Sequence, residues 1–189
     1  MAIIIAINLW VIYVIGYGIA LIVQVWANEK RGEPFEDPEL LKSKKFVFVL
    51  SLIWIFGGLI ISIFVPVTFG VLFNIGLIFS VIGLIIVLLT FYSFAQKAGL
   101  VTSKMLRYSR NPNYIGWVIY YFGLALMGWS ESIWSIFFFI YFLITIPYLH
   151  WVVLMEEKFL SNKYGDSYKE YLEKTPRYIG KPRKREQTT

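Results

Sequence analysis

Residues 46–95 read FVFVLSLIWIFGGLIISIFVPVTFGVLFNIGLIFSVIGLIIVLLTFYSFA, without one charged side chain. A transmembrane helix needs only about 20 apolar residues, so this stretch has room for two spans. Pro66 separates them, because proline lacks an N–H donor and collides with the preceding helical turn. The sequence therefore predicts an antiparallel helix pair, with a second span over about Phe46–Val65 and a third ending near Ala95.

Apolar segments of similar character lie on both sides of this pair. We predict a first span over roughly Ile3–Ala27, a fourth over Tyr114–Trp129, and a fifth helix that Ser130 caps and that extends to about Lys163. The whole chain of 189 residues is 58% hydrophobic, 19% aromatic and only 16% charged. This composition indicates an all-α integral membrane protein with about five transmembrane helices.

The segment after the fifth span is polar but patterned. Gly165 is expected to end the fifth helix and Asp166 to cap a second, short one. Leucine and tyrosines recur at helical spacing and give this segment an aromatic face: Leu160, Tyr164, Tyr168 and Tyr171. The sequence thus predicts a helical C-terminal segment outside the bilayer, followed by a disordered tail over 181–189.

The basic residues predict the orientation of the chain. Five of the 18 Lys and Arg lie in residues 28–45, four in 97–113 and nine after the fifth span, with none in the two opposite turns. Because cytoplasmic loops carry an excess of Lys and Arg, we expect a multi-pass protein with its N-terminus outside and its C-terminus cytosolic. The net charge of +6 is explained by this membrane surface, and we expect no nucleic-acid partner.

Few reactive residue types are available for chemistry. The chain has no cysteine and one histidine, which excludes disulfides, thiolate metal sites, Cys nucleophiles and a His-rich zinc site. We therefore expect no metal.

Two polar segments are expected at the basic side of the membrane. In the first, Asn111-Pro112-Asn113 forms a turn that opens a helix, whose N–H groups beside Arg110 suit an anion. Gly116 permits close approach of a ligand or of a neighbouring helix. An ordinary interfacial loop, with its arginines on lipid phosphates, is the alternative interpretation.

The second segment starts at Glu156-Glu157, a like-charged pair that favours nearby cations or a ligand's ammonium or hydroxyl groups. A solvated helix end is the plainer interpretation of this pair. His150 lies seven residues before Glu157 and shares its helical face. A lone histidine near an interface is more often structural than catalytic, although here it is included among the candidate cofactor-binding residues.

Together the two segments resemble the isoprenylcysteine carboxyl methyltransferase and phospholipid N-methyltransferase superfamily. Its pattern of Arg-His-Pro-x-Tyr-x-Gly, a hydrophobic hairpin, Glu-Glu, aromatic-Gly-x-x-Tyr-x-x-Tyr and Pro-Arg is matched over about residues 97–180. The matching residues are Arg110, Pro112, Tyr114, Gly116, Glu156, Glu157, Tyr164, Gly165, Tyr168, Tyr171, Pro176 and Arg177. One departure is Asn111, which stands where the family has histidine and which, unlike histidine, cannot titrate. Lys104 and Leu106 also depart from the common pattern.

The resemblance implies an S-adenosylmethionine-dependent methyltransferase that acts on a membrane-embedded, lipid-like or prenylated substrate. It divides the chain into three N-terminal transmembrane helices over 1–96, with a cytosolic loop at 28–45, and a methyltransferase-like core over 97–180. The cofactor-binding residues that it implies are Arg110, Asn111, Pro112, Tyr114, Gly116, His150, Glu156 and Glu157. The implied catalytic residues are Arg177, Arg110 and Glu157, and a lipid substrate would enter laterally between helices.

The sequence leaves open the methyl acceptor, a second enzyme class and a non-enzymatic role. A carboxylate acceptor needs the cationic clamp of Arg177 and Arg110, whereas an amine acceptor favours the glutamates. A nicotinamide-dependent sterol or steroid reductase is a second enzyme class, although Trp117 stands where those proteins commonly have glutamate. A non-catalytic scaffold or small transporter is the third, and the lack of a charged residue inside a span argues against transport.

Overall fold

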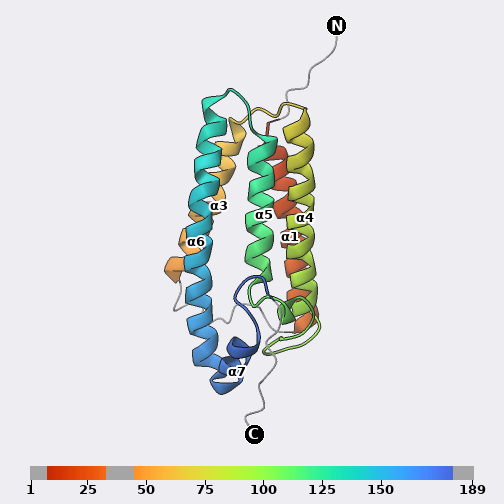
Figure 1. Ribbon diagram of the computed structural model, residues 1–189, viewed down its shortest axis with the longest axis vertical. Helices are drawn as coiled ribbons and strands as arrows, with labels where there is room; N and C mark the ends of the chain where they lie inside the picture. The colour runs from red at the N-terminus through yellow and green to blue at the C-terminus, as the bar shows by residue number, and fades with distance from the viewer. Residues whose placement is uncertain (1–7, 33–44, 181–189) are drawn as a thin grey trace.

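The protein is an antiparallel bundle of long helices with a short helix folded across one end (Figure 1). The computed structural model describes residues 8–32 and 45–180, without the side chains of 45–48. In this part of the chain the elements are α1 (Trp10–Arg31), α3 (Lys45–Ile63), α4 (Val71–Phe94), the 3-10 helix η1 (Lys104–Arg107), α5 (Pro112–Met127), α6 (Ile133–Tyr164) and α7 (Asp166–Lys174). The predicted all-helical class is confirmed for these residues.

Some sequence predictions fall outside the described residues. These are the start of the first span at Ile3, most of the loop at 28–45, and the disordered tail at 181–189. Within the described residues, α1 continues one turn beyond the predicted end at Ala27, and Gly32, with a φ of 71°, ends it. The break at Pro66 lies between α3 and α4 as predicted.

Three helices of the described chain are long and apolar enough to cross a membrane, namely α1, α4 and α6. The apolar stretch described in α3 is shorter, Val49–Ile63. Helix α5 has 16 residues, and at 1.5 Å per residue it rises about 24 Å, less than the ~30 Å hydrocarbon core. Of the about five transmembrane helices predicted, three are therefore confirmed, by length and composition, as long and apolar enough to cross a membrane.

Small residues bring α4 and α5 into backbone contact. A Cβ added to Gly123 would lie 2.5 Å from the carbonyl oxygen of Gly76, and one added to Gly83 would lie 2.6 Å from that of Gly116. Ser80 fills the remaining space beside Gly123. Close approach through glycine and serine is a common way to associate helices in lipid. This pair forms a rigid support for the loop that precedes α5.

Tyrosine hydroxyls connect the other helices. A Cβ on Gly16 of α1 would lie 2.6 Å from Cζ of Tyr120, whose hydroxyl donates to a carbonyl of α1 at 3.1 Å. Gly58 of α3 similarly leaves room for Tyr141, whose hydroxyl donates to a carbonyl of α3 at 3.1 Å. The buried hydroxyls thus have partners, and they join α5 to α1 and α6 to α3.

Two predicted caps are wrong by one or two residues. Ser132, and not Ser130, caps α6: its Oγ accepts from the Trp134 N–H at 3.3 Å, while the Ser130 hydroxyl is used within the turn. Gly165 ends α6 as predicted, but it also precedes α7 as the N-cap residue. Asp166 lies in the first turn of α7 and pairs with Lys169 at 2.9 Å.

One end of the bundle collects the polar chemistry. The C-terminal ends of α1, α4 and α6 meet there with the start of α5 and with α7, at the bottom of Figure 1. The basic segments 97–113 and 158–177 both lie at this end, which we call the basic end. The opposite end holds the short turns 64–70 and 128–132.

Filling the α4–α5 contact is expected to destabilise the protein. In Gly123→Leu the side chain would collide with Ser80 and with the backbone of α4, and overpacking of this kind costs about 1–3 kcal/mol. The thermal unfolding midpoint in detergent should fall by several degrees. Gly57→Leu is the matched control, because a Cβ at Gly57 meets nothing within 4 Å. Equal midpoints for the two variants would contradict the close contact.

Candidate functional site

The loop into α5 directs Asn111 inward. Asn111 has φ −131° and ψ 51°, outside helical geometry, and Pro112 begins α5. The Asn111 side chain does not cap the helix. Its amide Nδ2 instead donates to Glu157 Oε1 at 3.0 Å and to the Arg177 carbonyl at 3.2 Å. Two donors in different directions are what an amide group supplies.

Glu157 lies in a buried ion-pair cluster. Its exposed fraction is 7%. One carboxylate oxygen lies 3.4 Å from Arg110 Nη2, and the other lies 2.9 Å from Arg177 Nη2 and accepts from Arg177 Nε at 3.0 Å. The hydrogen bond to Glu157 raises the pKa of the Arg177 guanidinium above its ordinary value. This cluster, Arg110–Asn111–Glu157–Arg177, joins the loop, α6 and the C-terminal segment.

Backbone hydrogen bonds attach the segment after α7 to the same loop. The Arg110 N–H donates to the Pro176 carbonyl at 3.0 Å, and the Ser109 hydroxyl donates to the Arg177 carbonyl at 3.3 Å. The C-terminal segment, residues 175–178, therefore helps to fix the position of Arg110.

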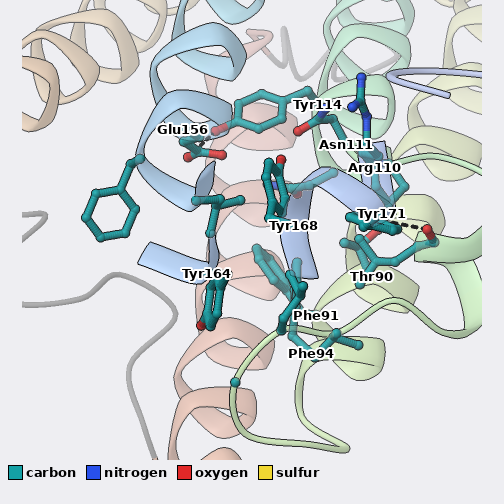
Figure 2. Close-up of a pocket in the computed structure, with 18 of the residues that line it drawn as sticks. Thr90, Phe91, Phe94, Arg110, Asn111, Tyr114, Glu156, Tyr164, Tyr168 and Tyr171 are labelled. Carbon is teal, nitrogen blue, oxygen red and sulfur yellow. Dashed lines mark hydrogen bonds between the residues drawn. The ribbon is translucent and has the colours of Figure 1, made fainter. Parts of the chain in front are cut away.

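Glu156 faces a different way from its neighbour. The Tyr114 hydroxyl of α5 donates to Glu156 Oε1 (Figure 2). Adjacent residues on a helix point about 100° apart, so Glu157 faces the ion-pair cluster while Glu156 faces a cavity. The two glutamates, equivalent in the sequence, have different surroundings.

The first cavity lies at the basic end and has a volume of about 210 Å³. Its wall combines polar residues from the loop before α5 and the start of that helix with Glu156 and aromatic rings from α4, α6 and α7 (Figure 2). These lining residues include Phe91, Phe94, Arg110, Asn111, Pro112, Asn113, Tyr114, Glu156, Tyr164, Tyr168 and Tyr171. The lining atoms Arg110 Nε and Asn113 Oδ1 are buried without a hydrogen-bond partner. A donor and an acceptor of the cavity wall are therefore available to a bound group.

Two tyrosines of α7 form the outer wall of this cavity. Tyr168 and Tyr171 are buried, and the Tyr171 hydroxyl donates to the Leu106 carbonyl at 2.6 Å. Burial raises the pKa of both hydroxyls above the ordinary value, and in Tyr168 the nearby Glu157 carboxylate adds to the effect. Both groups thus stay neutral and can donate hydrogen bonds.

The second cavity is larger and apolar, about 670 Å³, and lies between α1, α3, α5 and α6. Aromatic side chains make up much of its lining: Tyr17, Trp54, Trp117, Tyr121 and Tyr148. Five residues line both cavities, namely Gln24, Phe91, Asn113, Tyr114 and Glu156. These five residues, which we call the neck, form the boundary that the two cavities share.

The predicted site residues divide into three groups. Arg110, Asn111, Pro112, Tyr114 and Glu156 line the first cavity. Glu157 and Arg177 line neither cavity and meet in the ion-pair cluster. Gly116 packs against Gly83 and Val87 of α4, and His150 is hydrogen-bonded through Nδ1 to the Tyr178 hydroxyl at 2.6 Å.

Sequence reasoning missed the aromatic side chains that line the second cavity, and it did not include Asn113 among the predicted site residues. A signal for the wall exists in α5, where Tyr114, Trp117 and Tyr121 recur at helical spacing. Such a stripe equally fits helix packing, so it does not by itself predict a cavity.

Comparison with known proteins identifies one family. The model of the phospholipid methyltransferase family matches residues 62–167, which cover α4, α5, both glutamates and the neck residues other than Gln24. No curated protein and no solved structure matches the chain.

Proposed function

Because the chain belongs to the phospholipid methyltransferase family, we propose that it transfers a methyl group from S-adenosylmethionine to the amine of a membrane-embedded lipid. The observation that carries this proposal is the neck, whose residues line both the first cavity at the basic end and the apolar second cavity among the helices. A soluble donor and a lipid acceptor need two such compartments that share one point of contact.

The orientation is part of the proposal. The two basic segments of the described chain lie at the end where the first cavity opens, and cytoplasmic loops carry the excess of Lys and Arg. We propose that this end lies in the cytosol and that five helices cross the bilayer, namely α1, α3, α4, α5 and α6. The donor then reaches the first cavity from the cytosol.

The first cavity suits S-adenosylmethionine by the chemistry of its unpartnered atoms. The free Arg110 Nε can bind a carboxylate, and the free Asn113 Oδ1 can accept from an ammonium or hydroxyl group. The rings of Phe91 and Tyr168 provide faces against which an adenine can stack. Arg110, Asn111, Pro112, Tyr114 and Glu156 would hold the group, which supplies a methyl on a positively charged sulfur.

The second cavity favours an amine over a carboxylate acceptor. No Lys, Arg or His is among its described lining residues, and the one carboxylate there is Glu156, at the neck. The faces of Trp117 and Tyr148 attract a cation rather than an anion. The cationic clamp that a carboxylate needs would have to come from Arg110 and Arg177, both of which contact Glu157.

The residues at the neck then divide the chemical work. Glu156 holds the acceptor nitrogen by a hydrogen bond and accepts the proton that the nitrogen loses, and the Tyr114 hydroxyl orients the Glu156 carboxylate. When bound, S-adenosylmethionine would supply the methyl group and keep the electron pair of the broken sulfur–carbon bond, so the positive charge would pass from sulfur to the nitrogen, which then gives its proton to Glu156. The aromatic wall excludes water and holds the acceptor in line, which is the larger part of catalysis for methyl transfer.

The test is calorimetric binding of S-adenosylhomocysteine to the purified protein in detergent, with a nicotinamide dinucleotide as control. We expect micromolar binding of the former only. Incubation with labelled S-adenosylmethionine should then methylate a phosphatidylethanolamine and leave an isoprenylcysteine carboxylate unmodified. Binding of the dinucleotide instead would favour the reductase alternative, and methylation of the carboxylate alone would reverse the choice of acceptor. A protein that binds neither ligand would fit the scaffold alternative.

A further inference from the structure

The outer wall of the second cavity comes from the N-terminal helices. Its lining includes seven residues of α1 and six of α3, all of which precede the segment 62–167 that matches the family. Several of these lining residues are also exposed at the surface, with exposed fractions of 43% for Val14, 60% for Leu21 and 56% for Phe56. The cavity thus has a rim between α1 and α3 where it opens to the surroundings of the bundle.

Gly18 lies at this rim and leaves it open. It lines the second cavity, and a Cβ added there would meet nothing within 4 Å. Gly16, only two residues earlier, is in contact with the ring of Tyr120 and has no such room. Of these two neighbouring glycines, Gly16 therefore serves helix packing, whereas the space beside Gly18 belongs to the cavity.

Two aromatic residues that line the second cavity, one from α1 and one from α3, are held by stacking. Trp54 of α3 is stacked between Tyr141 and Tyr148, with centroid distances of 4.9 and 4.7 Å. Tyr17 of α1 is stacked on Trp117 at 4.6 Å. Stacked rings in a packed bundle do not move aside easily. A larger side chain at position 18 would therefore occupy space that now belongs to the cavity.

The chemistry of the cavity identifies its occupant. Apart from Gln24 and Ser51, the described lining is apolar and aromatic along α1 and α3, and its charged group, Glu156, lies at the neck. A hydrocarbon chain fits the apolar part, and a polar headgroup fits only at the neck. We propose that the opening between α1 and α3 at Gly18 admits a hydrocarbon tail of the acceptor lipid, and that Gly18 determines which acceptors fit. This inference rests on the proposed function.

The test compares Gly18→Phe with the matched control Gly57→Phe, since both glycines have free space and Gly57 does not line the cavity. With a long-chain amine lipid, kcat/KM of Gly18→Phe should fall at least about 10-fold, the effect of excluding only two methylenes from an apolar site. A short-chain amine that needs no tail pocket should be methylated as by the wild type. Gly18→Ala should lie between the wild type and Gly18→Phe, and Gly57→Phe should resemble the wild type.

A second readout does not depend on methyl transfer. A lipid with a photoreactive group in its tail should label the α1 and α3 residues of the rim in the wild type and in Gly57→Phe, but not in Gly18→Phe. Unchanged S-adenosylhomocysteine binding would show that Gly18→Phe is folded. Equal labelling of all three proteins, or full long-chain activity of Gly18→Phe, would overturn the inference. If labelling depended on position 18 but the wild type transferred no methyl group, the proposed function would be refuted and the inference about the tail would stand.

Discussion

Glu157→Ala should abolish S-adenosylhomocysteine binding and destabilise the basic end. Removal of the carboxylate leaves Arg110 and Arg177 without their shared anion, and Asn111 without an acceptor at 3.0 Å. Loss of one partner from a buried ion pair costs about 3–5 kcal/mol. Because Arg110 lines the first cavity, its displacement removes a donor that the cofactor needs. Calorimetry and thermal unfolding measure the two effects.

The control for this variant is Glu170→Ala in α7. Glu170 pairs with Lys174 at 2.5 Å on the surface, where its side chain is 49% exposed. Exposed ion pairs contribute about 0–1 kcal/mol to stability. This variant should therefore have the same thermal unfolding midpoint and the same affinity for S-adenosylhomocysteine as the wild type. If Glu157→Ala behaved like Glu170→Ala, the ion-pair cluster would have no role in holding the cofactor cavity.

Glu156→Gln should separate binding from catalysis. The amide keeps the size of the side chain and its place at the neck but cannot take a proton from the acceptor. Hydrogen bonds to charged groups are worth about 1.5–3 kcal/mol, so kcat/KM for the amine lipid should fall about 10- to 150-fold. Binding of S-adenosylhomocysteine should weaken much less, because the Arg110 cluster is intact.

The pH dependence distinguishes this role from a structural one. In the wild type, activity should fall when Glu156 is protonated at low pH, since the proton acceptor is then lost; the Gln variant should lack this limb. Tyr114→Phe is the companion variant, because it removes only the hydroxyl that donates to Glu156. It should lower activity less than Glu156→Gln. An identical pH profile for wild type and Glu156→Gln would exclude Glu156 as the proton acceptor.

Much of the bundle can be predicted from the sequence because the relevant signals are local. Charge-free runs predict the helices, and Pro66 predicts the turn between α3 and α4. The two antiparallel helices between the polar segments, α5 and α6, also require that α6 ends at the end of the bundle where α5 begins. Arg110 and Glu157, 47 positions apart, are therefore expected at one end, and the structure places them 3.4 Å apart.

The distinction between Glu156 and Glu157 could not be predicted in this way. It depends on the rotation of α6 about its axis, and α6 is apolar almost all round in its membrane part. The rotation is fixed by partners such as Tyr141, which enters the space at Gly58 of α3. Pairings of this kind lie between distant residues and leave no periodic signal.

The second cavity was also beyond sequence reasoning. It exists because α4 and α5 pack backbone to backbone at Gly76 and Gly123, whereas large stacked rings such as Trp54 and Tyr17 separate the remaining helices. Whether a ring fills a space or lines it depends on three-dimensional packing. Asn111 is a related case: the sequence shows only that it cannot titrate as the family histidine can, whereas the structure shows that its amide donates two hydrogen bonds within the ion-pair cluster.

The burial of the Glu157 cluster sets how the protein responds to ionic strength. Mobile ions screen charges over about 8 Å in physiological saline, but only where water can carry them between the charges. Glu157 is 7% exposed, whereas the carboxylate side chain of the Asp166–Lys169 pair on α7 is 95% exposed. High salt should therefore weaken the surface ion pairs of α7. The buried ion-pair cluster, which connects the loop, α6 and the C-terminal segment, should remain intact.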